Sequence, residues 1–200
     1  MKTRAIPGPL TLLISAFVAL LLSACATVPG RGELPVLPPL STLGCCWQAQ
    51  EQVVLRHDSR HQSLLAAIEV TPEHLTMVVL DATGYRLLTL RYDDHNGLQQ
   101  LNAPPHWDTL YSQYLLCAVF LHRLPPGSWR PENTHWQVES HNTGTTMQKA
   151  LTQTTAHGQA RELISLTYTD PENLEAGHRT LAIPGADIDI TITTLDRIDL

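Results

Sequence analysis

The sequence predicts an α+β fold that is mainly β, with an antiparallel sheet and one covering helix. Three observations predict this class. Between residues 47 and 92, short apolar runs that alternate at a period of two are separated by turn residues, which is typical of an antiparallel meander. Between residues 108 and 121, apolar residues recur at helical spacing. Several strand-like runs are apolar at consecutive positions, so the sheet should be covered on both faces or curl around something.

The first half of the domain should form a short strand followed by a meander of three strands. The alternation of side chains along a strand places Leu64, Ala66, Ile68 and Val70 on one face of the second strand. Pro72 favours a turn after it, because proline presets the backbone and cannot donate to a sheet. An Asn-Gly pair ends the meander with a strong turn signal. The expected strands cover residues 52–56, 63–70, 75–80 and 85–92, with turns at 71–74, 81–84 and 93–97.

One apolar segment in the middle of the chain predicts a helix. Two consecutive prolines break the chain before it, Asp108 can cap its first turn, and Pro125 follows its expected end near Leu121. Nearly the whole segment is apolar, so the helix should plug or cover the sheet rather than lie on the surface. Its expected apolar stripe is Leu110, Tyr114, Cys117 and Leu121, joined by Tyr111, Leu115 and Ala118.

The second half of the domain has weaker strand signals. Ile188, Ile190 and Ile192 alternate with polar residues and give the clearest of them. Residues 140–160 are rich in Thr, Gln and Gly and are expected to form a long loop, and residues 170–179 a shorter polar connection. The expected strands cover residues 135–139, 162–168, 180–183 and 187–195.

The N-terminus has the pattern of a bacterial lipoprotein signal. A basic start and an apolar run over residues 10–22 lead into a Leu-Ser-Ala-Cys sequence that ends at Cys25. The run is shorter than the about 20 apolar residues that a transmembrane helix needs. We expect cleavage before Cys25 and diacylglycerol on its thiol; an ordinary cleaved signal and an uncleaved anchor are the alternatives. The next residue is Ala26, whereas inner-membrane retention is associated with Asp there, so we expect anchoring in the outer membrane, on its periplasmic face.

This pattern divides the chain into a signal peptide over residues 1–24, a lipidated cysteine with a Pro/Gly-rich tether over 25–46, and one globular domain over 47–200. Removing Lys2 and Arg4 with the signal changes the formal net charge from −6 to −8. This charge argues against a nucleic-acid-binding protein and against electrostatic attachment to anionic lipid. Contact with the membrane is therefore expected through the acyl chains on the N-terminal cysteine.

Three cysteines remain after the lipidated one. A bridge between adjacent cysteines strains the peptide link, so Cys45 or Cys46 is expected to pair with Cys117 if a disulfide forms. The alternative, in which all three are reduced or buried thiols, fits the sequence as well. The spacing lacks the paired cysteines of a zinc site.

No motif after the signal indicates catalysis, a metal or another cofactor. His57 and His61 are four residues apart, but the residues between them indicate a hairpin turn rather than one helical face. Ser128 has no nucleophile elbow around it. Asp93, Asp94 and His95 could be drawn as a catalytic cluster but fit a polar turn better. Asp187 and Asp189 could be paired catalytic carboxylates, but they fit the solvent-facing side of a strand. The tryptophans could line an apolar pocket or belong to the core: Trp47, Trp107, Trp129 and Trp136.

Two blocks in the meander carry a family resemblance. They are Leu64–Thr76 (LLAAIEVTPEHLT) and Gly84–Tyr92 (GYRLLTLRY). With the order of signal, tether, meander, apolar helix and later strands, they resemble the LolA/LolB-like proteins of lipoprotein and lipid transport. More closely, the chain resembles a family of lipoproteins encoded beside aryl-polyene biosynthesis genes. The resemblance implies an unclosed, strongly curved antiparallel sheet, a half-barrel of about a dozen strands, with one or more helices covering its concave face.

The resemblance also implies a function without catalytic residues. Such a half-barrel would bind or transfer a lipid-like hydrophobic ligand in the periplasm, such as a lipid, an acylated molecule or an aryl-polyene lipid. A periplasmic LolA-like carrier would be a further partner. The turn at 81–84 has no large apolar tip of the kind that LolB-type receptors carry, which favours ligand binding over lipoprotein insertion. The residues expected to line the cavity are Leu64, Ile68, Met77, Leu88, Leu90, Leu110, Tyr114 and Leu115.

Two other classes of function remain as alternatives to the lipid carrier. One is a non-catalytic envelope assembly lipoprotein whose curved sheet binds a protein partner. The other is a hydrolase that acts on lipid or envelope sugar.

Overall fold

The computed structural model describes residues 35–57, 59–105, 107–129, 135–155, 158–174, 177–184, 186 and 188–200. The expected signal peptide, Cys25, the start of the tether and Asp187 lie outside these residues. Residues 35–200 form one compact unit with its own hydrophobic core, so a chain that begins shortly before Pro35 keeps everything that the core needs.

The unit is built from one antiparallel sheet of ten strands. Their order is β5-β4-β3-β2-β1-β10-β9-β8-β7-β6, so the first five strands form one half, the last five form the other, and β1 pairs with β10 where the halves meet. The strands are β1 (Trp47–His57), β2 (Arg60–Val70), β3 (Leu75–Asp81), β4 (Arg86–Asp93), β5 (Gly97–Asn102), β6 (Trp136–Asn142), β7 (Met147–Thr154), β8 (Ala160–Tyr168), β9 (His178–Ala182) and β10 (Asp189–Asp199).

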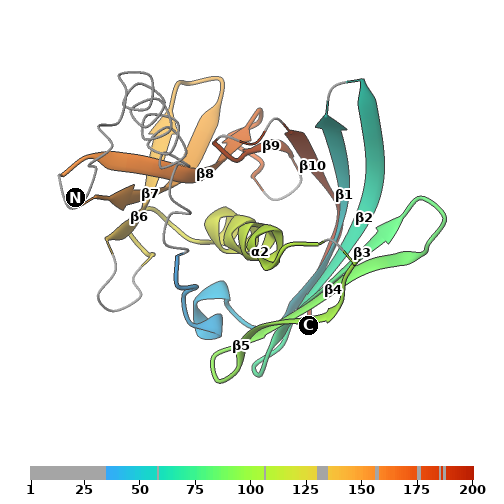
Figure 1. Ribbon diagram of the computed structural model, residues 1–200. Helices are drawn as coiled ribbons and strands as arrows, with labels where there is room; N and C mark the ends of the chain where they lie inside the picture. Colours follow the sequence, from blue (N-terminus) through green and yellow to red (C-terminus); the bar gives the residue numbers. More distant parts are fainter. Residues whose placement is uncertain are drawn as a thin grey trace, which may run out of the picture. The chain divides into compact units, whose positions relative to one another are not determined.

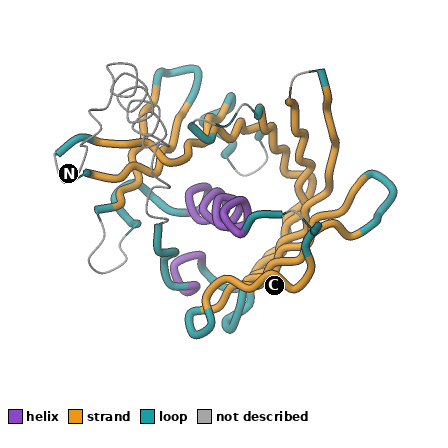
Figure 2. The backbone as a smooth tube through the Cα atoms, in the orientation of Figure 1, coloured by secondary structure: helices purple, strands orange, loops and turns teal. Residues whose placement is uncertain are grey.

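The sheet curves strongly around the long helix α2 (Thr109–Arg123) and is not closed, since β5 and β6 are its two edges (Figures 1 and 2). This confirms the expected fold class: mainly β, with an open, curved antiparallel sheet and a helix on its concave side. Among the described residues the sheet has ten strands rather than about a dozen. Within the described ranges, no helix is both long enough and apolar enough to cross a membrane.

The alternation in the meander places apolar side chains on the concave side. In β2, Ala66, Ile68 and Val70 are buried and the residues between them are partly exposed. Leu75 and Met77 continue the buried face in β3, opposite Val70 and Ile68. The expected face of these two strands is therefore correct.

Helix α2 begins and ends close to where the sequence predicts. The Asp108 side chain accepts a hydrogen bond from the backbone N–H of Leu110 (3.0 Å), which caps the first turn. At the other end, the Lys149 ammonium group donates to the carbonyl oxygens of His122 (2.9 Å) and Leu124 (3.1 Å). A cation at these carbonyls compensates the partial negative charge of a helix C-terminus.

The prediction of a long loop over 140–160 is wrong, because this stretch contains all of β7 and the start of β8. Four consecutive residues of β7, from Lys149 to Thr152, are buried, so buried and exposed positions do not alternate along this strand. Lys149 can be buried there because the helix end provides its acceptors. Strand β5 was also not expected, and its half-exposed, polar residues carry little strand signal.

The packed unit starts earlier than Trp47, and the expected tether over 25–46 is corrected at its C-terminal half. Leu37, Leu40 and Leu43 are buried in the core, the last two in the short 3-10 helix η1 (Leu40–Leu43). The backbone N–H of Leu40 donates to the Asp94 carboxylate (2.7 Å), and the Tyr92 hydroxyl donates to the Pro38 carbonyl (3.0 Å). The high proline content of this stretch indicates a tether, but the stretch also carries three regularly spaced leucines that pack beside β4.

The expected pairing of Cys45 or Cys46 with Cys117 is wrong. Cys45 and Cys46 are bonded to each other, and Cys117 is a free, buried thiol. Cys117 lies in the middle of α2 with no exposed surface, whereas the two bonded cysteines are more accessible and lie just before β1. Burial raises the pKa of the Cys117 thiol, so this group stays protonated.

Candidate functional site

A cavity of about 550 Å³ lies between α2 and the concave face of the sheet. This volume is within the range of about 300–1,000 Å³ that is typical of small-molecule sites. Strands β1, β2, β3, β4, β9 and β10 supply the sheet wall, and most of the lining side chains are aliphatic or aromatic. An apolar wall of this kind favours an apolar ligand.

The cavity exists because α2 packs near the two edges of the open sheet and not against its middle strands. Its close contacts are with β8, β7 and β5, so space remains between the helix and the strands in the middle of the sheet. Ala49, Ala66 and Ala118 line that space with small side chains that leave it unfilled. The stripe of α2 that faces the cavity repeats at intervals of three and four: Tyr111, Tyr114, Leu115, Ala118, Val119, His122 and Arg123.

Most of the side chains expected to line a cavity are on its wall: Leu64, Ile68, Met77, Leu88, Tyr114 and Leu115. Leu90 and Leu110 are not. Leu90 is fully buried in the filled part of the core, opposite Met77. Leu110 lies in the first turn of α2, where its neighbour Tyr111 faces the cavity instead. The expected helical stripe mixed two faces, because Cys117 and Leu121 point into the core.

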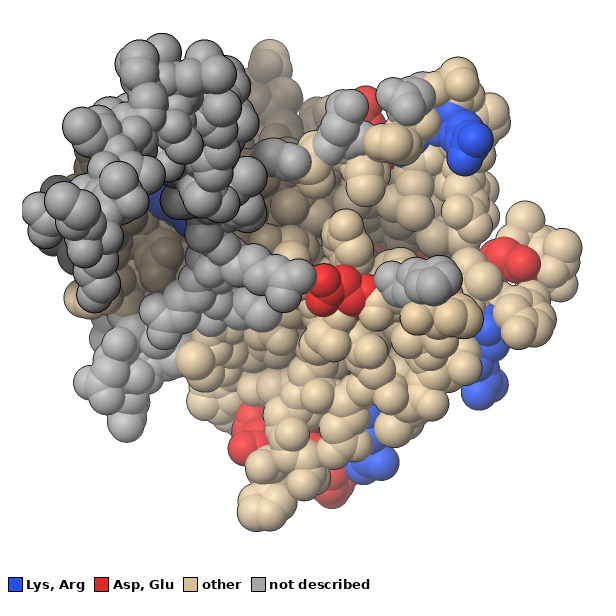
Figure 3. Space-filling view, in the orientation of Figure 1, with Lys and Arg blue, Asp and Glu red and all other residues tan. Residues whose placement is uncertain are grey.

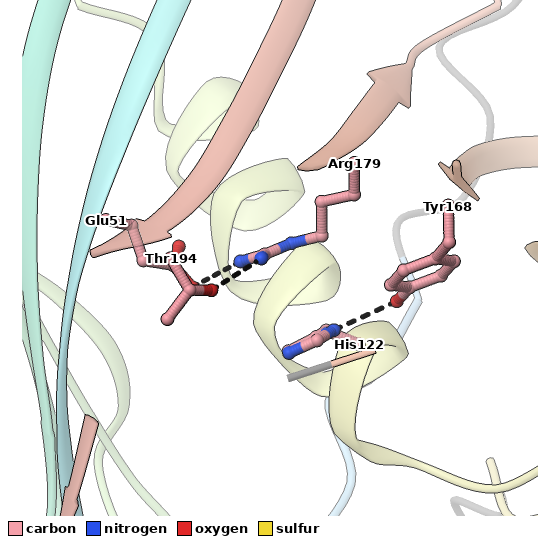
Figure 4. Close-up of polar contacts among 5 residues, drawn as sticks. All are labelled: Glu51, His122, Tyr168, Arg179 and Thr194. Atoms are coloured by element: carbon pink, nitrogen blue, oxygen red, sulfur yellow. Dashed lines mark hydrogen bonds and ion pairs between the residues drawn. The ribbon is translucent and has the colours of Figure 1, made fainter. Parts of the chain in front are cut away.

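A buried ion pair interrupts the apolar wall. The Arg179 guanidinium on β9 donates from Nη2 to the Glu51 carboxylate on β1 and from Nη1 to the Thr194 hydroxyl on β10 (2.9 Å for the latter bond; Figure 4). The side chains of Arg179 and Glu51 are 3% and 10% exposed. The pair therefore links three strands across the junction between the two halves of the sheet.

These polar residues are not among those expected to line the cavity, although the sequence carries a signal for them. Glu51 lies on the face of β1 that also carries Trp47, Ala49 and Val53, and a charged residue at a position of an apolar face indicates a buried partner. Arg179 likewise shares the buried face of β9 with Leu181.

His122 and Tyr168 form a second polar pair beside the ion pair (Figure 4). The Tyr168 hydroxyl lies 2.9 Å from His122 Nδ1, and the two rings stack with centroids 5.8 Å apart. Burial, followed by the positive charges of Arg179, Arg123, Lys149 and Arg197, lowers the pKa of His122 from 6.5 to about 2. The ring is therefore neutral, with one nitrogen that donates and one that accepts.

Two more arginines meet at Trp47. The Arg123 guanidinium lies 4.4 Å from the centroid of the indole ring, and that of Arg197 lies 5.6 Å from it. Both distances are in the range of cation–π contacts. Arg197 also donates to the Asp199 carboxylate (3.0 Å). Trp47 and both arginines line the cavity at the C-terminal end of α2.

Charged side chains on the outside are more dispersed. On the face drawn in Figure 3, the Lys, Arg, Asp and Glu side chains of the described residues lie in small separate groups. By contrast, three arginines lie together on the cavity wall, in a chain whose formal net charge is −6.

The other residues considered for chemistry lie apart from the cavity. The Asp93 carboxylate accepts hydrogen bonds from the backbone N–H groups of His95 (3.0 Å) and Asn96 (2.6 Å), which lower its pKa and close a turn. His57 and His61 are exposed near the end of the β1–β2 hairpin. In the part of the chain that is described, no three His, Cys, Asp or Glu side chains are grouped as metal ligands would be.

The remaining candidates for a catalytic or binding role belong to a turn, to the surface or to the core. Ser128 donates to the Pro125 carbonyl in a turn, and Asp189 is exposed at the start of β10. Among the tryptophans, Trp47 and Trp107 line the cavity, whereas Trp129 and Trp136 are buried in the core.

One known protein family matches nearly the whole packed unit. The sequence model of the family described as "Protein of unknown function (DUF3261)" matches residues 48–196. The chain belongs to the DUF3261 family. The match runs from β1 to β10 and so includes α2 and both walls of the cavity. No curated protein matches this DUF3261 chain.

The pKa of His122 predicts a pH dependence of stability in this DUF3261 domain. Between pH 6.5 and about 2, the unfolded chain binds a proton at His122 that the folded chain does not. The free energy of unfolding should therefore fall as the pH drops through this window, by up to about 1.4 kcal/mol per pH unit from this group. The measurement is urea unfolding of the wild type and His122→Gln at several pH values, where the variant should have a shallower slope.

The control is His95→Gln, which changes an exposed histidine in a turn. It should keep the wild-type slope. Equal slopes for His122→Gln and the wild type would mean that the His122 ring titrates in the folded protein as it does in the unfolded chain, contrary to its buried, positively charged surroundings.

Proposed function

We propose that this DUF3261 protein is a non-enzymatic carrier that binds a lipid-like hydrophobic ligand between α2 and the curved sheet. The observation that supports this most directly is the mainly apolar cavity of about 550 Å³. Each methylene group that moves from water into such a cavity contributes about 0.8 kcal/mol, so an acyl chain has a large driving force to enter.

The N-terminal pattern and the resemblance add a location and a ligand class to this proposal. The Leu-Ser-Ala-Cys sequence at Cys25 supports an outer-membrane lipoprotein on the periplasmic face, where diacylglycerol would hold the domain near a leaflet. The resemblance to LolA/LolB-like proteins and to lipoproteins of aryl-polyene gene clusters supports a lipid, an acylated molecule or an aryl-polyene lipid as ligand. A periplasmic LolA-like carrier would exchange it.

Binding of a fluorescent long-chain fatty acid tests the proposal. The protein is the chain without residues 1–26, which retains the entire packed unit. We expect saturable binding that Leu115→Asp weakens at least tenfold, because Leu115 lines the cavity and burying a leucine side chain contributes about 1.5–3 kcal/mol. The measurement is a fluorescence titration of both proteins.

A matched control is Leu101→Asp, since Leu101 is 59% exposed on β5 and is not on the cavity wall. It should bind the probe as the wild type does. A well-folded wild type with no saturable binding would contradict a lipid carrier and would leave the protein-partner alternative in its place.

A further inference from the structure

The cavity is amphipathic along its length. The stripe of α2 that lines it runs from Tyr111 to Arg123, about 18 Å at a rise of 1.5 Å per residue. Its N-terminal end faces Pro104 and Trp107, which are apolar or aromatic. Its C-terminal end lies over Trp47, where the guanidinium groups gather. A ligand that fits this space should have an apolar part and a polar end.

Cationic side chains gather at the polar end. Arg123, Arg179 and Arg197 line it, and Glu51 is the one carboxylate among the described lining residues. Asp199, which lies outside the lining, pairs with Arg197. The pKa of His122 is lowered first by burial and then by the charges of Arg179, Arg123, Lys149 and Arg197, so all four cations lie close enough to act on that ring.

The Arg179 guanidinium has a donor to spare. Its Nη1 and Nη2 groups bond to Thr194 and Glu51, whereas its buried Nε has no hydrogen-bond partner among the described residues. A buried N–H without a partner costs free energy, and a guanidinium is suited to carboxylate and phosphate oxygens. An anion that enters this end of the cavity would supply the acceptor that the Arg179 Nε group lacks.

We propose that the arginine end of the cavity, formed by Arg123, Arg179 and Arg197 beside Trp47, binds the acidic headgroup of an amphiphile. The headgroup is a carboxylate or a phosphate, and the hydrocarbon tail lies along the apolar wall toward Tyr111. This inference rests on the proposed function and adds the chemical class of the ligand. A fully apolar ligand would leave these guanidinium groups against hydrocarbon, which is unfavourable for charged groups.

The test compares ligands that share a tail and differ in the headgroup. Palmitic acid, methyl palmitate and palmitoyl lysophosphatidic acid compete with a fluorescent fatty acid for the chain without residues 1–26. We expect the acid to bind at least about tenfold more tightly than its methyl ester, because a charge-assisted hydrogen bond is lost in the ester. If lysophosphatidic acid binds more tightly than palmitic acid, phosphate is the preferred headgroup. If it binds more weakly, carboxylate is preferred.

The variants assign the preference to the arginine end. In Arg123→Gln/Arg197→Gln, which leaves the buried Glu51–Arg179 pair intact, the preference for acid over ester should fall to less than about threefold while ester binding stays unchanged. Arg56→Gln changes an exposed arginine of β1 and should keep the wild-type preference. Circular dichroism verifies folding, and the wild-type acid-to-ester ratio gives a result even if the double variant does not fold.

Each outcome supports or contradicts the inference. Equal affinity for acid and ester in the wild type would overturn the headgroup site while the proposed carrier function stands. An acid preference that survives in Arg123→Gln/Arg197→Gln would mean that these two arginines do not bind the headgroup and would overturn the three-arginine site. Failure of all three ligands to bind would contradict the proposed function itself.

Discussion

Replacing Arg179 with leucine should lower the free energy of unfolding by about 3–5 kcal/mol, because it leaves the Glu51 carboxylate buried without its cation. The side chains of both partners are almost inaccessible, at 3% and 10% exposed, so water cannot take over the lost interaction. The Thr194 hydroxyl loses its donor in the same variant. Urea unfolding at pH 7, followed by circular dichroism, measures the change.

The double variant Glu51→Leu/Arg179→Leu is the matched comparison. Removing both charges leaves no uncompensated group, so most of the lost stability should return, and a double-mutant cycle should give a coupling of several kcal/mol. Arg56→Leu, at an exposed position of β1, should change stability by less than about 0.5 kcal/mol. A loss below about 1 kcal/mol for Arg179→Leu would contradict the buried pair.

The position of this pair explains how a curved sheet of ten strands is held open over a cavity. β1 and β10 join the two halves, and Glu51, Thr194 and Arg179 connect β1, β10 and β9 at this junction. Hydrophobic packing cannot act across an unfilled cavity, because the facing side chains do not touch. Directional polar bonds on the concave wall fix the strands where packing is missing.

The sequence predicts the elements whose signal is local. The alternation in β2 and β3 and the Asp108 cap of α2 depend on residues close together in the chain, and each is present in the structure. β7 could not be predicted in this way, since its buried Lys149 is stabilised by carbonyl oxygens of His122 and Leu124 more than twenty residues away. A polar residue in a strand is predicted to be exposed unless the distant group that accepts its hydrogen bond is known.

The same limit applies to the cavity. Its apolar wall follows from the pattern of the meander and from the resemblance, which indicate residues such as Leu64 and Leu115. The arginine end does not, because it brings together Arg123, Arg179 and Arg197 from the helix and from two later strands. The expected helical stripe mixes two faces because most of α2 is apolar, so its periodicity does not say which side meets the core.

The two faces of α2 should respond differently to the loss of a side chain. Phe120 has no exposed surface and packs edge-to-face against Tyr92 (centroids 5.7 Å apart) and Trp129 (6.1 Å). Phe120→Ala should lower the free energy of unfolding by about 3–5 kcal/mol, the cost typical of removing a phenyl ring from a filled core. Urea unfolding measures this change.

The neighbouring residue provides the contrast, because Val119 faces the cavity. Val119→Ala removes two methyl groups that already border empty space, so the loss of stability should stay below about 2 kcal/mol at about 0.8 kcal/mol per methyl or methylene group. If the cavity is the ligand site, Val119→Ala should change the affinity for the fluorescent fatty acid, whereas Phe120→Ala, under conditions where it is folded, should leave it close to the wild-type value. The reverse pattern would mean that the ligand binds on the side of α2 that packs against Tyr92 and Trp129, and not in the space between the helix and the middle of the sheet.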